Sequence, residues 1–249
     1  MQSDISDSKT KYYIGCSGWY YAHWRGLYYP PEILKIDWLS FYAKKKNTVE
    51  INSSFYCLPS INSLIRWKKS TPDNFIFSTK VSRYITHVKK LRNSETALDN
   101  FLSRISILKE KLGPLLYQLP PSIKRDDTML CDFLSLLPQN YQYTFEFRHK
   151  SWINDSVFQI LQKYNIALCI SDMPDIDIPL INTADFMYIR FHGNRKLYTS
   201  CYSDSELRQW SRDIQRFSGN VKALYIYFNN DAQAYAVNNA QVMINYLSS

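Results

Sequence analysis

The stretch YTFEFRHKSW, residues 143–152, decides the fold class of this chain. It opens with an apolar, strand-like run and ends with Glu146, Arg148 and His149. Two later segments have the same form, namely MYIRFHG (187–193), with Arg190 and His192, and LYIYFNND (224–231), with Asn229, Asn230 and Asp231. Apolar strands that end in polar side chains are typical of parallel α/β barrels, whose chemistry lies at the carboxyl ends of the strands. The repetition predicts one shared site.

Eight apolar runs indicate strands, and segments of helical periodicity lie between most of them. The predicted strands cover residues 12–16, 48–51, 75–79, 115–119, 143–147, 167–171, 186–191 and 223–228. The predicted helices cover residues 37–46, 61–70, 94–112, 126–137, 155–164, 203–217 and 232–247. This alternation predicts an α/β fold with a parallel sheet, a (β/α)8 TIM barrel. Residues 173–185 hold two prolines and no helical period, so we expect an imperfect barrel without a regular helix at that crossover.

Six motifs together resemble one known family. They are IGCSGWYYAHWRGLYYP (14–30), NTVEINSSFYCLPS (47–60), KLGPLLYQLPPS (111–122) and the three segments quoted above. In this order, and over residues 12–240, they are similar to the DUF72 family, also called YecE-like. The resemblance implies a TIM barrel. It implies no particular activity, because the family's name records that its function is unassigned.

The composition favours a single intracellular domain. With 249 residues, 45% of them hydrophobic, one barrel uses nearly the whole chain, so we expect a disordered tail at residues 1–10 and one domain over residues 11–249. No apolar run approaches the roughly 18 residues of a membrane span, and the amino terminus lacks the apolar stretch of a signal peptide. The five cysteines form no CxxC pair, so neither a disulfide framework nor a structural zinc site is indicated. A cytoplasmic protein without membrane partners is expected.

The charge and the aromatic content suggest the class of ligand. Thirty Lys and Arg against 22 Asp and Glu give a net charge of +8, alongside 20 Tyr, 13 Phe and 6 Trp. Cations with aromatic rings suit a phosphate-bearing small molecule or a nucleic acid. The charge is spread, however, and its clusters at residues 44–46 and 88–92 are short, so a basic protein with a solvated surface is an equal alternative. The sequence does not indicate an oligomeric state.

Nearly every predicted strand ends in a polar group, which a purely structural barrel does not require. The catalytic candidates are Glu50, Glu146, Asp172 and His192, and the substrate-binding candidates are Ser17, Trp19, His23, Asn52, Lys80, Gln118, Arg148, Arg190, Asn229 and Asp231. Imidazole titrates near neutral pH, and Gly193 beside His192 permits close approach of a ligand. Arginine forks favour phosphate or carboxylate, so an anionic substrate is expected.

The two glutamates allow two explanations. Both lie inside apolar runs, where an unpaired carboxylate is costly, so each needs a cation, a donor or a metal. They are either acid/base groups or members of buried ion pairs, such as Glu146 with Arg190 or Glu50 with Lys80. Strand alternation also predicts that Arg148 shares the inward face of Glu146.

The same alternation predicts that Arg190 shares a face with His192, while Phe145 and Phe147 point toward the helices. His149 has the wrong parity for the inward face. A divalent metal is a candidate cofactor, because Glu, Asp and His are the ligands in metal-dependent barrels such as xylose isomerase and endonuclease IV, whose architecture this resembles. The chain has no HxH or HExxH motif, and Arg or Lys flanks several candidate ligands, which argues against a metal.

Three functions remain open at this point. The first is an enzyme acting on an anionic, phosphate-bearing substrate, with hydrolysis, including cleavage of nucleic acid, as the reaction class. The second is a non-catalytic protein that binds nucleic acid or a nucleotide. The third is a sugar-processing enzyme, favoured by the paired carboxylates and disfavoured by the neighbouring cations. No Gly-rich phosphate loop or GxGxxG motif is present, so the sequence gives no support to an ATP-driven or nicotinamide-dependent reaction.

Overall fold

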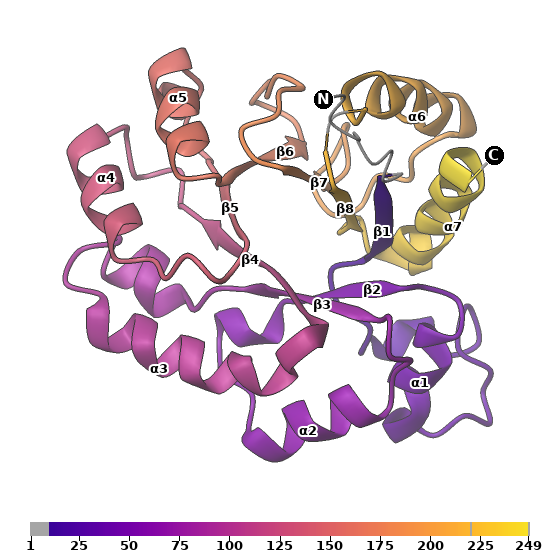
Figure 1. Ribbon diagram of the computed structural model, residues 1–249. Coiled ribbons are helices and arrows are strands. Elements are labelled where there is room, and N and C mark those ends of the chain that lie inside the picture. Colours follow the sequence, from indigo (N-terminus) through magenta and orange to yellow (C-terminus); the bar gives the residue numbers. More distant parts are fainter. Residues whose placement is uncertain (1–9, 220, 249) are drawn as a thin grey trace, which may run out of the picture.

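The computed structural model describes residues 10–219 and 221–248, and it shows parallel strands in a ring with helices outside it (Figure 1). The strands are β1 (Lys11–Cys16), β2 (Thr48–Ile51), β3 (Ile76–Lys80), β4 (Leu112–Gln118), β5 (Tyr143–Glu146), β6 (Ala167–Asp172), β7 (Phe186–Phe191) and β8 (Ala223–Phe228). They form an eight-stranded sheet in the order β1-β8-β7-β6-β5-β4-β3-β2. The predicted TIM barrel is confirmed.

Helices follow most of the strands. They are α1 (Trp38–Ala43), α2 (Ile61–Lys69), α3 (Glu95–Ile105), α4 (Asp127–Ser135), α5 (Asp155–Lys163), α6 (Asp204–Phe217) and α7 (Tyr235–Ser248). Short helical turns are η1 (Ala22–Trp24), η2 (Lys35–Asp37), η3 (Ser53–Phe55), η4 (Tyr84–Val88), η5 (Ser106–Lys111), η6 (Lys150–Trp152) and η7 (Ala232–Ala234). No helix joins β6 to β7, so the predicted irregular crossover is confirmed.

Local sequence explains where several helices begin and end. Asp126 accepts a hydrogen bond from the Met129 amide at 2.9 Å and caps α4. Ser203 and Glu206 form a reciprocal capping box at the start of α6. The helix predicted over residues 94–112 divides after Ile105 into α3 and η5, and Lys109, inside η5, has a φ of 53°. An L-residue in that left-handed region cannot continue a right-handed helix.

The barrel closes between β1 and β2 through side chains more than through a strand ladder. The only backbone bridge found between these two strands in the described chain joins Ser17 and Glu50. Asn47 connects the strands nearer their amino ends, because its Oδ1 accepts from the Ile14 amide at 3.1 Å and its Nδ2 donates to the Tyr12 carbonyl at 2.7 Å. This seam places Ser17 beside Glu50 at the carboxyl end.

A second bridge across the seam is the Tyr42 hydroxyl. It accepts from the Cys16 amide at 2.8 Å and donates to the Thr48 carbonyl at 3.0 Å. Gly15 lies between these groups, and a Cβ there would come within 2.1 Å of the Thr48 carbonyl oxygen. Glycine is required at this position by the close approach of the two strands.

Alternation along β7 shows how the barrel divides its side chains. Met187, Ile189 and Phe191 belong to the large hydrophobic core that includes the helices. Phe186 and Tyr188 belong to a second, smaller core inside the barrel. The inward series on β7 therefore begins with aromatic rings at the amino end and continues to the charged residues at the carboxyl end. Among the described helices, none is long and apolar enough to cross a membrane.

Residues 1–9 lie outside the described part of the chain, so the predicted tail at residues 1–10 is described only at its last residue. The Thr10 hydroxyl donates to the carbonyl oxygens of Val221 at 2.9 Å and Ser218 at 3.2 Å. These bonds connect the beginning of β1 to the turn that precedes β8. Thr10 therefore packs against the barrel, next to the predicted domain boundary at residue 11.

Candidate functional site

Three buried charges meet at the carboxyl ends of β2, β5 and β7. Arg190 donates from Nη2 to Glu50 Oε1 at 2.8 Å and from Nη1 to Glu146 Oε2 at 2.5 Å. The arginine side chain is 1% exposed and both glutamates are fully buried. Buried charges are tolerated when they are paired and hydrogen-bonded, and one guanidinium here neutralises two carboxylates in part. The predicted Glu146–Arg190 pair forms, whereas Glu50 pairs with Arg190 and not with Lys80.

Arg148 and His192 extend this triad toward the barrel mouth. Arg148 donates from Nε to Glu146 Oε1, and its Nη2 lies 3.0 Å from His192 Nε2. A guanidinium only donates, so His192 Nε2 is the acceptor and the proton of a neutral ring lies on Nδ1. His192 Nδ1 is 3.1 Å from Asn229 Nδ2, so exchanging the nitrogen and oxygen of the Asn229 amide gives this proton an acceptor. We call Glu50, Glu146, Arg148, Arg190 and His192 the charged cluster.

The protonation states of the cluster follow from its electrostatics. Burial acts to raise the pKa of Glu146, but the Arg148 and Arg190 guanidiniums hold it well below its usual range. Burial, and after it the charge of Arg190, lowers the pKa of His192 to about 4. At neutral pH Glu146 is therefore a carboxylate and His192 a neutral imidazole.

Glu50 is surrounded by hydrogen-bond donors. Besides Arg190, the Ser17 hydroxyl donates to Oε1 at 2.7 Å and the Tyr188 hydroxyl donates to Oε2 at 2.6 Å. Burial and the Glu50 charge raise the pKa of Tyr188 well above its usual value, so this phenol remains a donor. Tyr188 did not appear among the predicted site residues, although its parity with Arg190 and His192 on β7 points to it.

Lys80, at the end of β3, is the uncommitted cation of the site. Its Nζ lies 4.2 Å from the centre of the Phe55 ring, and it forms no salt bridge within the described chain. Burial, followed by the charge of Arg190, lowers the pKa of Lys80 to about 8. The charges of Glu146, Glu50 and Arg148 also act on it, which places the amine in the electrostatic field of the cluster.

The predicted parity of β5 is confirmed. Glu146 and Arg148 point inward to the cluster, while Phe145 stacks on Tyr117 with ring centres 5.0 Å apart, in the outer core. Phe147 likewise points outward. His149 caps η6, where its Nδ1 accepts from the Ser151 amide at 3.1 Å, and it takes no part in the cluster.

Asp172 does not join the cluster, contrary to the prediction from its position at a strand end. On β6 the inward residues are Cys169 and Ser171, because Cys169 Sγ lies 3.8 Å from Glu146 Oε2 and 3.7 Å from Ser171 Oγ. Alternation therefore sends Asp172 outward, where its carboxylate meets Tyr202 and Trp210. Burial raises the pKa of Asp172 in that setting.

His23 and Asp231 form a pair with each other and are not part of the charged cluster. His23 Nε2 lies 3.1 Å from Asp231 Oδ2, and Trp24 Nε1 donates to Asp231 Oδ1 at 2.6 Å. Burial raises the pKa of Asp231 to about 6. These contacts connect the segment after β1 to the segment after β8 and form part of the barrel rim.

The remaining candidates lie around the mouth. Gln118 is half-buried at the end of β4, directly across the ladder from Glu146. Asn52, two residues after Glu50, donates from Nδ2 to the Ser17 carbonyl at 3.3 Å. Trp19 is 7% exposed and packs edge-on against Trp67 with ring centres 5.0 Å apart.

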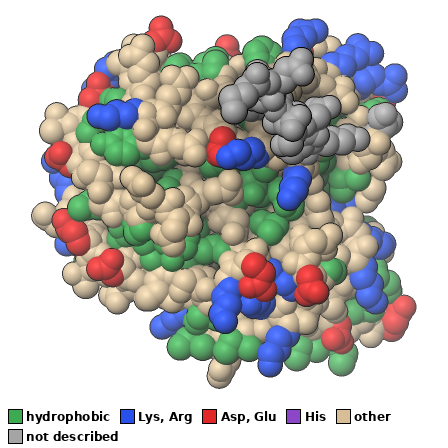
Figure 2. Space-filling model, in the orientation of Figure 1, with side chains coloured by type: hydrophobic (Ala, Val, Ile, Leu, Met, Phe, Trp, Pro, Cys, Tyr) green, Lys and Arg blue, Asp and Glu red, His purple; other side chains and the backbone are tan. Residues whose placement is uncertain are grey.

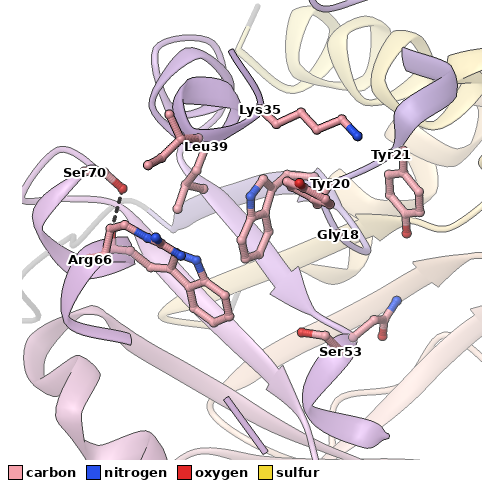
Figure 3. Close-up of a pocket in the computed structure, with 12 residues that line it drawn as sticks. Gly18, Tyr20, Tyr21, Lys35, Leu39, Ser53, Arg66 and Ser70 are labelled. Atoms are coloured by element: carbon pink, nitrogen blue, oxygen red, sulfur yellow. Dashed lines mark hydrogen bonds between the residues drawn. The ribbon is translucent and has the colours of Figure 1, made fainter. Parts of the chain in front are cut away.

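Trp19 and Asn52 line a pocket of about 640 Å³ beside the cluster (Figure 3). Sequence reasoning did not predict this pocket, because half of its wall comes from helical residues whose faces only the fold brings together. In residues 10–219 and 221–248, no group of three or more His, Cys, Asp or Glu side chains is arranged to hold a metal ion. Both glutamates instead direct their oxygens at arginines.

Comparison with known proteins identifies the family. The profile of the family described as "Protein of unknown function DUF72" matches residues 13–249. The UPF0759 protein YecE of Escherichia coli K12 is 34% identical over 138 residues, which are 55% of this chain and 48% of YecE. The chain thus matches about half the length of that relative. The UPF0759 protein YunF of Bacillus subtilis is 23% identical over 94% of each chain.

A crystal structure agrees with these matches. A DUF72 family protein of Thermotoga maritima superposes with a TM-score of 0.87 and 28% identity, and the alignment covers 96% of this chain and 100% of that one. The printed names of these relatives state no activity. The eight-stranded barrel, the profile match over nearly the whole length and the structural likeness agree that this chain belongs to the DUF72 family.

Proposed function

We propose that this protein is an enzyme whose site lies at the carboxyl end of the barrel and which acts on an anionic, phosphate-bearing substrate, with hydrolysis as the reaction class. The observation that supports it best is a charge imbalance. Lys80, Arg148 and Arg190 are three cations around two carboxylates, and His192 is neutral. One positive charge is left without a partner, and a bound anion would neutralise it.

The cluster supplies cations that are already positioned. Arg190 and Arg148 are held by Glu146 at fixed positions, so an approaching anion need not order them. Lys80 and Arg148 keep some exposure and would contact the substrate, whereas Arg190 lies beneath them. In this arrangement Glu146 is a positioning residue for both guanidiniums.

Proton transfer belongs to Lys80 in this proposal. General acids and bases work best when their pKa lies near the operating pH, and the Lys80 pKa of about 8 meets this condition. Protonated Lys80 would hold the phosphate while a water molecule attacks phosphorus and the bond to the departing oxygen breaks. Lys80 would give its proton to that oxygen, and its neutral amine would then take up a proton released by the added water. Glu146 is unsuited to the role of general acid, because the neighbouring guanidiniums hold its pKa well below its usual range.

The proposal is tested by comparing two lysines. Lys80→Met removes the unmatched charge at the mouth, and Lys11→Met removes an exposed charge at the amino end of the barrel. Binding of inorganic phosphate would be measured by calorimetry at pH 7. We expect about a tenfold loss of affinity for Lys80→Met, in line with a lost charge-assisted contact. Equal affinities for the two variants would refute a phosphate site at Lys80.

A turnover assay separates an enzyme from a non-catalytic binder. The substrates would be p-nitrophenyl phosphate and bis(p-nitrophenyl) phosphate, and the variants Lys80→Met, Lys80→Arg and Lys11→Met. An enzyme that uses the Lys80 proton loses turnover in Lys80→Arg, because the arginine retains the charge but does not release its proton near neutral pH. A binder shows no turnover above background in any variant and loses phosphate affinity steeply as salt is added.

On the face drawn in Figure 2, Lys and Arg side chains are scattered and Asp and Glu lie among them. That face therefore presents no continuous basic surface of the kind that follows a nucleic-acid backbone. The support for an anionic substrate comes from the barrel mouth and not from the +8 net charge of the chain.

A further inference from the structure

The pocket beside the charged cluster lies between the segments after β1 and β2 and the helical elements η2, α1 and α2. Its volume of about 640 Å³ is within the range of small-molecule sites. In Figure 3, Gly18, Tyr20 and Tyr21 lie on one side and Arg66 and Leu39 on the other, with Ser53 below and Lys35 along the upper edge as drawn.

Aromatic and aliphatic side chains form much of the lining. Trp19 and Trp67 meet edge-on in the wall, and Ile36 and Tyr20 are 64% and 59% exposed at the opening. Large apolar side chains exposed around a cavity commonly mark a binding site. A flat ring that enters this pocket would cover them and stack on an aromatic face.

The pocket also carries positive charge without a matching acid. Lys35 and Arg66 line it, no Asp or Glu does, and neither cation forms a salt bridge in the described part of the chain. This differs from the charged cluster, where both glutamates are bound to guanidiniums. An apolar pocket whose edge carries two cations without salt bridges selects a ligand that joins a flat ring to an anion.

The side chain of Asn52 indicates that the flat ring of the ligand carries a hydrogen-bond donor. Its side-chain Nδ2 donates to the Ser17 carbonyl, while its Oδ1 is buried and has no partner in the described structure. An orphaned acceptor costs free energy, which an N–H group on the ligand would recover after a small rotation of the amide. Nucleobases offer such N–H groups on a flat ring, whereas sugars can donate through hydroxyl groups but have no flat ring to cover the aromatic wall.

Ser17 connects the pocket to the cluster. Its carbonyl accepts from Asn52 and from the Tyr21 hydroxyl at 2.5 Å, both in the pocket wall, and its own hydroxyl donates to Glu50. We infer that the pocket holds one nucleotide unit, with the base against the aromatic wall and its phosphate against Arg66 and Lys35. This rests on the proposed function and names its substrate class as an oligonucleotide, or a nucleotide with a second phosphate, whose reacting phosphate lies beside Lys80 while the phosphate of the bound unit contacts Arg66 and Lys35.

The test measures binding of adenosine 5′-monophosphate, adenosine and ribose 5-phosphate by calorimetry, with matched variants. Arg66→Ala is paired with Lys69→Ala, which removes an exposed cation from the same helix but outside the pocket. Tyr20→Ala is paired with Tyr56→Ala, since Tyr56 is 81% exposed and does not line the pocket. All four side chains are exposed, so the variants should fold alike.

We expect adenosine 5′-monophosphate to bind more tightly than either fragment. Arg66→Ala should weaken it about tenfold and leave adenosine unchanged, because only a charge-assisted contact to the phosphate is lost. Tyr20→Ala should weaken both ligands, and the two control variants neither. No binding of adenosine 5′-monophosphate at millimolar concentration, or equal effects of Arg66→Ala and Lys69→Ala, would overturn the inference.

Lys80→Met separates this inference from the proposed function. If Lys80→Met weakens phosphate binding while Arg66→Ala and Tyr20→Ala leave the affinity for adenosine 5′-monophosphate unchanged, the proposed function stands and the pocket inference fails. If adenosine 5′-monophosphate depends on Arg66 and Tyr20 while Lys80→Met changes neither phosphate affinity nor turnover, the pocket binds nucleotides and the proposed function fails.

Discussion

The charged cluster and the neighbouring pocket hold their charges in opposite ways. In the cluster, Glu50 and Glu146 are fully buried, and arginine, serine and tyrosine donors surround them. In the pocket, Arg66 and Lys35 are exposed cations at the edge of an aromatic cavity, with no acid beside them. The first arrangement keeps side chains in place, and the second leaves charge available to a ligand.

The difference separates stability from recognition. Breaking a buried network leaves uncompensated charge, so cluster variants should lose stability first and function as a consequence. Removing a pocket cation leaves nothing unpaired, so pocket variants should lose affinity at unchanged stability. Lys80 lies between these extremes, since it is half-buried, close to the cluster and without an ion partner.

The largest effect is expected from Glu146→Gln. The substitution leaves Arg148 and Arg190 facing a neutral amide, and breaking a buried pair of this kind costs about 3–5 kcal/mol of unfolding free energy. Urea denaturation followed by circular dichroism would measure it. Arg66→Ala, the matched change in the pocket, should stay within about 0.5 kcal/mol of the parent protein. Similar losses for the two variants would remove the distinction between the regions.

The next effect is a loss of stability in acid that depends on His192. Its folded pKa of about 4 lies below the usual 6.5, so between these values the unfolded chain binds more protons than the folded one. Stability therefore falls as the pH drops from 6.5 toward 4, by about 3 kcal/mol for a shift of this size. The His192→Asn variant should show a smaller loss across this window when both proteins are unfolded with urea. Parallel curves would show that His192 is not held neutral.

A third prediction concerns the pH dependence of anion binding at Lys80. The amine is charged below its pKa of about 8 and neutral above it, so sulfate affinity should fall as the pH rises through 8. Sulfate is the suitable probe because its own charge is constant across this range. Lys80→Arg should bind sulfate without a transition near pH 8, since its guanidinium stays charged. An unchanged transition in that variant would assign the titration to another group.

The smallest effect on stability and the clearest effect on binding should come from Tyr20→Ala. The ring is 59% exposed, so its removal should change the unfolding free energy by less than about 0.5 kcal/mol. Adenosine affinity should nonetheless fall, by about 1 kcal/mol or more for one lost stacking contact. Thermal unfolding and calorimetry on the same sample would check both, with Tyr56→Ala as the control.

The fold could be predicted from the sequence because each strand ends in a polar side chain after an apolar run. The strands predicted at 48–51, 186–191 and 223–228 have the observed bounds, and the family motifs span the barrel. The break inside η5 at Lys109 was not predicted, because a lysine carries no turn signal. Helix propensity alone predicts an unbroken helix across this residue.

The cluster was predictable for a related reason. The parity of Glu146 with Arg148, and of Arg190 with His192, follows from strand geometry alone. Asp172 shows the limit of this reasoning, since a shift of one residue in parity turns a strand-end carboxylate outward. The pocket could not be predicted from the sequence, because Lys35 and Arg66 belong to separate elements that only tertiary structure brings together.

The protonation of Lys80 tests the proposed site most directly. Nitrogen-edited NMR of the lysine side chains, assigned with Lys80→Arg, would give its pKa with and without saturating sulfate. We predict a midpoint near pH 8 in the free protein, moved upward by sulfate because the bound anion stabilises the charged amine. A midpoint near the usual lysine value of about 10.4, unchanged by sulfate, would show that Lys80 neither lies in the field of the cluster nor binds the anion.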